Sequence, residues 1–163
     1  MVTTLPRVSR RDQITMSDAE VLAFLDEERV VTCASFGPRG WPHLMPLWYV
    51  VREGTLWSWT FGKSQKVKNL ERDPRCTLEV EAGRDVYHLL RGVMLECEAK
   101  IHRDLDTVTG IGMELAGRYG GGEGDPAEMQ AAFEKQAAKR VGLEFTERHR
   151  ASWDHRKLGS ATY

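Results

Sequence analysis

The stretch of this sequence best suited to bind an anion is the basic segment 61–75. It holds five lysines and arginines against two acidic residues, in a chain whose formal net charge is −1. Ser64 can cap a helix in this segment, and Pro74 ends it. A helix N-terminus offers unpaired N–H groups and partial positive charge, so Ser64, Lys66 and Lys68 could form a phosphate-sized anion site. The alternative is a solvated basic helix face.

Other chemistries lack a necessary residue. Gly62-Lys63-Ser64 is like the end of a nucleotide-binding P-loop, but Trp57 stands where the first glycine belongs. The five histidines show no metal-ligand spacing, and no Gly-x-Ser-x-Gly turn of a serine hydrolase is present. We therefore predict no metal site and identify no catalytic acid, base or nucleophile.

The elements before the basic segment read as a helix and three strands. Ser17 and Glu20 predict a capping box for a helix over 18–28. A β-branched strand follows at 30–36. Residues 42–51 and the aromatic-rich 55–61 then predict the two strands of a hairpin, turned at Arg52-Glu53-Gly54.

The elements after it read as strands followed by helices. Alternation predicts strands at 76–82 and 87–102. Gly92, inside the long strand, indicates close approach by a ligand or another chain. Its neighbour Arg91 lies on an apolar face and needs an anion, either across an interface or from a cofactor. Helices are predicted at 104–119 and 125–140, joined by the glycine-rich segment 120–124. Together they would form a helical cover that is either fixed or moves as a lid. A strand at 141–146 and a polar tail at 153–157 follow.

Composition indicates one ordinary globular domain over 17–163. A chain of 163 residues that is 41% apolar and 29% charged can bury one core. Near-neutral charge argues against a nucleic-acid partner. Residues 1–16 lack an apolar run, so we expect a flexible arm, with neither a signal peptide nor a membrane anchor. Cys33, Cys76 and Cys97 all fall in predicted strands, which is typical of reduced thiols in a cytoplasmic protein.

Strands outnumber helices and follow one another in sequence, which predicts a mainly β, α+β fold built on an antiparallel barrel. Several segments also resemble one family. They are the run from Gly40 through Pro46-Leu47-Trp48, Ser58-Trp59-Thr60, Ser64 to Leu70, and Asp73-Pro74-Arg75. Together they resemble the pyridoxamine 5′-phosphate oxidase-like split-barrel proteins, and within these the flavin/deazaflavin oxidoreductases that use coenzyme F-420.

The resemblance implies a split β-barrel of the FMN-binding-protein type that forms a homodimer, with a cofactor cleft at each side of the interface. It places Trp59 and Thr60 beside the cofactor, and Ser64 and Lys66, with Lys63 and Lys68, at its phosphate. The backbone at Pro46, Leu47 and Trp48 would face the ring. Residues 153–158 resemble the closing motif of this branch, which adds Trp153 and Arg156 to the expected cofactor contacts, together with Arg91.

Two departures bear on the cofactor. The family's flavin-phosphate oxidases place an arginine where this chain has Gln65, and their basic strand is here apolar, with Met45 and Val50. Both favour coenzyme F-420, with FMN as the alternative. The expected function is hydride transfer between F-420 and an unidentified small organic molecule. Two alternatives are an FMN-dependent oxidoreductase and a non-catalytic protein that binds a deazaflavin, haem or another tetrapyrrole.

Overall fold

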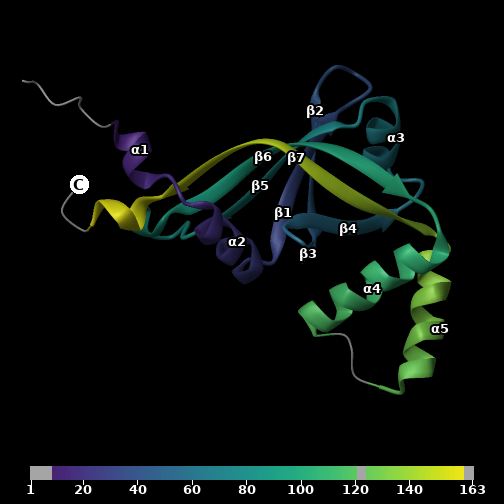
Figure 1. Cartoon of the computed structure of the whole chain (residues 1–163). Helices are drawn as coiled ribbons and strands as arrows, with labels where there is room; N and C mark the ends of the chain where they lie inside the picture. Colours follow the sequence, from purple (N-terminus) through teal and green to yellow (C-terminus); the bar gives the residue numbers. More distant parts are fainter. Residues whose placement is uncertain (1–8, 121–123, 160–163) are drawn as a thin grey trace, which may run out of the picture.

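The computed structural model describes residues 9–120 and 124–159, and its centre is one antiparallel seven-stranded sheet of order β2-β1-β5-β6-β7-β4-β3 (Figure 1). The strands are β1 (Val30–Phe36), β2 (Pro42–Trp48), β3 (Val50–Arg52), β4 (Thr55–Phe61), β5 (Arg75–Ala82), β6 (Arg91–His102) and β7 (Arg140–Asp154). The helices are α1 (Arg10–Ile14), α2 (Asp18–Glu27), α3 (Gln65–Arg72), α4 (Leu105–Tyr119) and α5 (Pro126–Ala137). The predicted mainly β, antiparallel α+β class is confirmed.

The sheet curls into a half-barrel because its two edge strands, β2 and β3, are joined through a single residue, Tyr49. One residue spans less than about 4 Å, so the two edges must meet in space. The Tyr49 side chain is fully buried, and its hydroxyl donates to the Leu25 carbonyl at 2.7 Å. The Ser58 hydroxyl donates to the Trp48 carbonyl at 2.7 Å beside the crossing.

The predicted hairpin of 42–51 with 55–61 is therefore wrong for most of its length. Only the short β3 pairs with β4, with Val50 opposite Trp57. The longer β2 pairs instead with β1, with Trp48 opposite Val30. An alternating pattern predicts a strand but does not identify the strand beside it.

Strands β6 and β7 form the longest ladder, from Arg91 opposite Asp154 to His102 opposite Gly142. Two predictions are corrected here. Tyr87–Leu89 forms a 3-10 turn instead of the start of a strand. The final strand runs on to Asp154, so the start of the predicted polar tail belongs to the sheet, and a second 3-10 turn follows at His155–Leu158. Four consecutive exposed residues at 146–149 interrupt the alternating pattern from which a strand is predicted. Pairing with β6 nevertheless keeps this polar stretch extended.

Gly92 is approached closely, but by a side chain of its own chain and not by the predicted ligand or second chain. A Cβ atom at this position would lie 2.3 Å from Cζ2 of Trp153, the residue opposite it in β7. The indole therefore lies directly over the glycine backbone. This contact anchors the end of the β6–β7 ladder that lies far from α3 (Figure 1).

The helices sit at the two ends of the sheet. The α2 capping box is confirmed, since the Ser17 backbone N–H donates to Glu20 Oε2 at 2.7 Å. The expected arm is described only from Ser9 onward, where the short α1 begins beside the end of β7 (Figure 1). Helix α4 packs beside β3, β4 and β7, and α5 packs on α4 and β7, in the region where the helical cover was predicted. Part of the predicted glycine hinge, 121–123, lies outside the described residues.

Several contacts fix α4 in place. The Arg118 guanidinium donates to the carbonyl oxygens of Leu25 at 3.0 Å and Glu28 at 2.9 Å. Glu114 pairs with Arg52 of β3 at 2.7 Å. These bonds tie both α2 and β3 to the helix. These contacts favour a fixed cover over a moving lid, and the choice between them stays a prediction.

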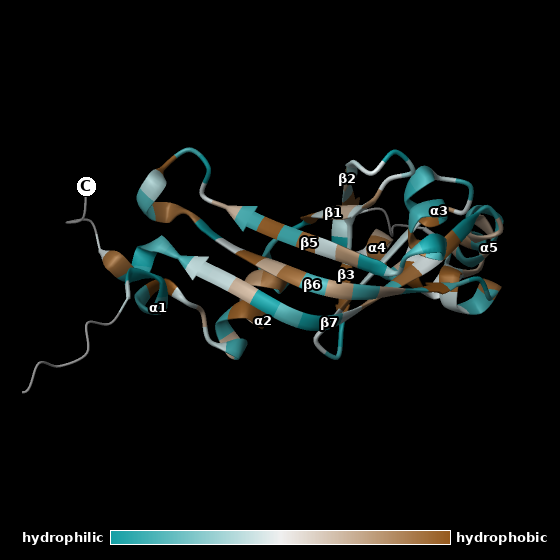
Figure 2. Ribbon diagram, turned by 90° about the horizontal axis from the view of Figure 1, so that it is seen from above, coloured by the Kyte–Doolittle hydropathy of each residue, from teal (hydrophilic) through white to brown (hydrophobic). Residues whose placement is uncertain are grey.

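The core lies inside the curl of the sheet, between the sheet and helices α2 and α3. Buried positions alternate along β5 with exposed or half-buried ones, and Figure 2 shows hydrophobic and hydrophilic bands along the same strand. Val67 and Leu70 turn the inner face of α3 onto this core. The three cysteines, Cys33, Cys76 and Cys97, are buried and free, as expected from their strand positions.

Candidate functional site

A hollow of about 540 Å³ opens beside the crossing from β2 to β3, between β2, β4, α3 and the start of β7. Six of its nine lining residues are predicted cofactor contacts, namely Pro46, Leu47, Trp48, Trp59, Thr60 and Lys66. Three others, Val30, Phe61 and Arg140, were missed by the sequence analysis. The fold thus brings the predicted ring-facing strand and the predicted lysine to one cavity.

Two tryptophans form flat walls of this cavity. Trp48 leaves 58% of its surface exposed and stacks on Tyr119 of α4, with ring centroids 4.6 Å apart and planes 8° from parallel. Trp59 is half-buried against α4 at Gly112, where a Cβ atom would lie 2.5 Å from the indole. Flat aromatic surfaces of this kind suit the stacking of a planar ring system.

Lys66 lies deeper than the sequence suggested. Only 8% of the residue is exposed, and its ammonium donates to the Thr60 hydroxyl at 3.0 Å. Burial lowers the pKa of Lys66 from its ordinary value, while the nearby Cys33 thiol acts in the opposite direction. A desolvated ammonium bonded to one neutral hydroxyl is costly unless an anion joins it. Lys66 therefore lines the inner part of the hollow and not a solvated helix face.

The start of α3 lacks the side-chain cap that was predicted at Ser64. Ser64 is the N-cap residue, but its side chain makes no capping bond, and its hydroxyl is buried without a hydrogen-bond partner among the described residues. Lys63 and Lys68 are exposed and do not line the hollow. The Ser64 hydroxyl is thus an unsatisfied polar group at the start of α3. Lys63 and Lys68 point to solvent within one chain, and their contact with a phosphate stays a prediction.

The other predicted contacts lie at the opposite end of the sheet from α3 (Figure 1). Arg91 pairs with Glu27 at 2.7 Å and Glu28 at 3.6 Å, so the anionic partner expected from an interface or a cofactor is supplied by its own chain. Arg156 pairs with Asp154 at 2.6 Å, and Trp153 covers Gly92. Within one chain these residues do not join the hollow, and their contact with a cofactor stays a prediction.

Arg140 is the most informative residue that the sequence analysis missed. It is the first residue of β7 and stands opposite Phe61 of β4. Its guanidinium carbon lies 4.4 Å from the centre of the Trp59 ring and 4.5 Å from that of Phe61. The sequence placed it at the end of a helix, so no local signal linked it to the aromatic strand. The pairing of β4 with β7 makes that link.

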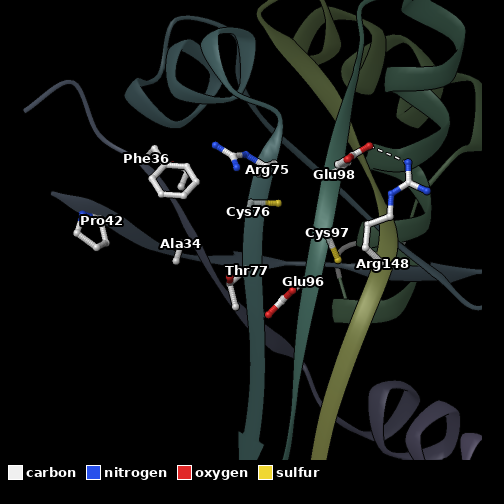
Figure 3. Close-up of a pocket in the computed structure, with 11 residues that line it drawn as sticks. Ala34, Phe36, Pro42, Arg75, Cys76, Thr77, Glu96, Cys97, Glu98 and Arg148 are labelled. Atoms are coloured by element: carbon white, nitrogen blue, oxygen red, sulfur yellow. Dashed lines mark hydrogen bonds and ion pairs between the residues drawn. The ribbon is translucent and has the colours of Figure 1, made fainter. Parts of the chain in front are cut away.

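A second hollow, of about 380 Å³, lies on β1, β5, β6 and β7 (Figure 3). Its arginines are already neutralised, since Arg148 pairs with Glu98 and Arg75 with Asp73, each at 2.7 Å. Burial raises the pKa of the Cys97 thiol in its floor to about 12, so this sulfur stays protonated near neutral pH. The described lining of this hollow offers no unpaired cation, which makes the first hollow the better candidate site.

Two further classes of site find no support in the described part of the chain. Its histidines, cysteines and carboxylates form no group of three or more that could hold a metal ion. None of its helices is long and apolar enough to cross a lipid bilayer.

The comparison with family models decides the family. Residues 17–153 match the model described as pyridoxamine 5′-phosphate oxidase, which covers most of the 163 residues. This chain belongs to the pyridoxamine 5′-phosphate oxidase family. The predicted resemblance is confirmed, and the curled sheet is the split barrel of that family. It is a family of flavin-binding oxidoreductases, whose members bind flavins or deazaflavins.

Solved structures agree with this assignment. The conserved hypothetical protein Rv2991 from Mycobacterium tuberculosis is similar to this chain with 40% identity, a TM-score of 0.85 and 96% of each chain covered. An F-420 reductase shares the fold at 19% identity and a TM-score of 0.61, covering 79% of this chain and 94% of its own.

The haem storage protein HutZ from Vibrio cholerae shares the fold at 13% identity and a TM-score of 0.62, covering 80% and 89%. The fold thus occurs both in a reductase and in a storage protein. No curated protein sequence matches this chain.

Proposed function

We propose that this protein is an oxidoreductase that binds coenzyme F-420 in the hollow between β2, β4, α3 and β7 and transfers a hydride between it and a small organic molecule. The observation that carries the proposal is the combination of two tryptophan walls with Lys66, a buried ammonium that has no carboxylate partner among the described residues. A planar cofactor with an anionic tail satisfies both features.

The cavity fits this kind of cofactor. Trp48 and Trp59 supply surfaces for the ring, and Leu47 and Pro46 supply apolar backbone beside it. Lys66, joined by the unpartnered hydroxyl of Ser64, would hold the phosphate. When bound, a reduced deazaflavin supplies the hydride. The protein would bind and orient the ring and exclude water from it, while the solvent supplies the proton.

The lining of the cavity is consistent with cofactor-based chemistry. It contains no histidine, aspartate, glutamate or cysteine among the described residues, so the side chains most often used as acid, base or thiol nucleophile are not found there. Positioning and desolvation are the contributions left to the protein. The Gln65 side chain donates to Asn69 at 2.9 Å and, unlike the arginine expected at this position in flavin-phosphate oxidases, carries no charge for an FMN phosphate, which is why we favour F-420.

We also propose that the protein acts as a homodimer. Exposed apolar side chains gather on one face of β1 and β2, where Phe36, Leu44 and Trp48 each leave more than half of their surface exposed, and Val30 lies opposite Trp48. A patch of this kind on a soluble protein marks an interaction surface. Its continuity with the exposed face of Trp48 suits a second copy that closes the cavity. Light scattering on the purified protein should give a dimer, and Leu44→Glu should give a folded monomer.

The direct test of the cofactor is tryptophan fluorescence of the purified protein, titrated separately with F-420 and with FMN. We expect saturable quenching by F-420 at micromolar or lower concentration and much weaker quenching by FMN. Preference for FMN would identify the protein as a flavin-dependent oxidoreductase instead. Turnover is then tested by following the absorbance of reduced F-420 with quinones and α,β-unsaturated carbonyl compounds as acceptors. Tight binding without turnover would indicate a carrier protein.

A further inference from the structure

Arginines in the described part of the chain show a consistent pattern with one exception. Five of them are half-buried. Four have a carboxylate partner within about 3 Å, namely Arg52 with Glu114 at 2.7 Å, Arg91 with Glu27 at 2.7 Å, Arg118 with Asp26 at 2.9 Å and Arg150 with Glu147 at 2.6 Å. The fifth, Arg140, has no carboxylate partner among the described residues, and its bond to the Gln136 carbonyl is long, at 3.4 Å.

The position of Arg140 leaves its donors available. Its guanidinium lies over the rings of Trp59 and Phe61, at 4.4 and 4.5 Å from their centres. Cation–π contact uses the face of a guanidinium, while its N–H groups point outward in the plane and can still bind an oxyanion in a fork. The stacking therefore fixes the orientation of the group without occupying its hydrogen bonds.

The cavity around Arg140 carries positive charge only. Its two basic lining residues are Lys66 and Arg140, and no lining residue in the described chain is acidic. Lys66 lies at the inner end and is already bonded to Thr60, whereas Arg140 is the less buried of the two. Burying a charge without a counter-charge is unfavourable. A site with two separated cations suits a ligand that carries a second anionic group.

We propose that Arg140 binds an oxyanion, a carboxylate or a phosphate, of a molecule bound in the cavity, and that it selects anionic ligands there. The proposal for Arg140 rests on the proposed function, because it takes the cavity to be the cofactor site. The oxyanion belongs either to the cofactor or to the substrate. Both sources offer the same forked acceptor to the guanidinium, so the experiment separates them.

The first arm compares each cofactor with an analogue that lacks its anionic groups. FMN is compared with riboflavin, and F-420 with its riboside that lacks the phosphate and the acidic tail, using the wild-type protein and Arg140→Gln. If the cofactor supplies the oxyanion, the variant should bind the charged member about 10- to 100-fold more weakly and the uncharged member nearly as well as before. Arg140→Lys should recover part of the loss, since lysine keeps the charge but not the fork.

The second arm tests the substrate as the source. Cofactor-loaded protein is titrated with benzoate and with inorganic phosphate, followed by the absorbance of the bound cofactor. Unchanged cofactor affinity in Arg140→Gln, together with a benzoate or phosphate response that only the wild type shows, would assign the oxyanion to the substrate. The same titration on cofactor-free protein, followed by tryptophan fluorescence, tests Arg140 even if neither cofactor binds. Failure of both cofactors to bind would contradict the proposed function but not the proposal for Arg140.

Arg52→Gln is the matched control. Arg52 also stacks on a tryptophan of β4, at 4.8 Å from the Trp57 ring, but it already pairs with Glu114. We expect this variant to lose some thermal stability and to keep the same preference for charged ligands. Equal losses for charged and uncharged ligands in Arg140→Gln would show that Arg140 only supports Trp59 and would overturn the proposal. The absence of any anion response in both arms would overturn it as well.

Discussion

Trp48 and Tyr119 stack almost in parallel, with ring centroids 4.6 Å apart, although they are 71 positions apart in the sequence. The Tyr119 hydroxyl accepts a hydrogen bond from the Tyr49 backbone N–H at 3.1 Å and lies 2.5 Å from the Arg29 carbonyl. The last residue of α4 therefore both satisfies the backbone at the crossing from β2 to β3 and supports one wall of the candidate site.

Substitutions of Tyr119 should separate these two roles. Tyr119→Phe keeps the ring but leaves the Tyr49 N–H unpaired, which should cost about 1–3 kcal/mol of unfolding free energy and leave cofactor affinity nearly unchanged. Tyr119→Leu also removes the stacking and should weaken binding. Thermal unfolding and fluorescence titration measure the two effects. Equal cofactor affinity in both variants would show that the stacking does not position Trp48.

Gly112 should be required for the position of Trp59. A methyl group there would meet the indole at 2.5 Å and the Phe133 ring at 3.1 Å, so Gly112→Ala must move α4, α5 or Trp59. We expect a loss of about 1–3 kcal/mol in unfolding free energy and weaker cofactor binding.

Gly117→Ala in the same helix is the control for Gly112. No atom lies within 4 Å of the added Cβ, so this change should stabilise the helix by up to about 1 kcal/mol and leave binding unchanged. Similar behaviour of the two variants would mean that α4 can shift away from β4 at little cost.

Lys66 should favour binding at the expense of stability. Lys66→Met keeps most of the side-chain volume and removes an ammonium that is desolvated without a carboxylate, so the cofactor-free protein should melt at the same or a higher temperature. Affinity for a phosphate-bearing cofactor should fall about 10- to 100-fold. Lys68→Met, on the exposed side of α3, should change neither property. A Lys66→Met protein that is much less stable would show that this lysine is primarily structural.

The Asp154–Arg156 pair should make stability depend on pH in the acid range. Hydrogen bonding from Arg156 holds the pKa of Asp154 below its ordinary 3.8, although burial opposes the shift. A carboxylate with a depressed pKa in the folded state stabilises the protein above pH 3.8 and loses that contribution as pH falls through the folded-state pKa.

Asp154→Asn tests this pair. The difference in unfolding free energy between the wild type and the variant should be constant from about pH 5 to 7 and shrink below pH 3.8. Asp85→Asn, in an exposed turn, is the control. A difference between wild type and Asp154→Asn that grows on acidification would contradict the sign of the shift.

Most local elements, and six of the nine residues that line the candidate site, could be named from the sequence and its family resemblance. The Ser17 capping box begins α2, and Pro74 limits α3, because caps and breakers act within a few residues. The family motifs also named Trp48, Trp59 and Lys66, and the fold places all three at one cavity. These features depend on short-range geometry or on motifs that the chain retains.

Tertiary structure decided the rest, because it depends on which segments become neighbours. The alternation of residues 42–51 could not show that β2 ends before Tyr49 and pairs with β1. Likewise, β7 extends beyond the predicted strand at 141–146 because it pairs with β6 over a longer stretch. The charge pattern of the sequence indicated Lys66 but not that it is buried. It also predicted an anion from outside the chain for Arg91, whereas Glu27 of α2 is its partner. Arg140 reaches the site only through the pairing of β4 with β7. Burial and ion pairing depend on contacts between distant segments, which are set only when the whole sheet closes.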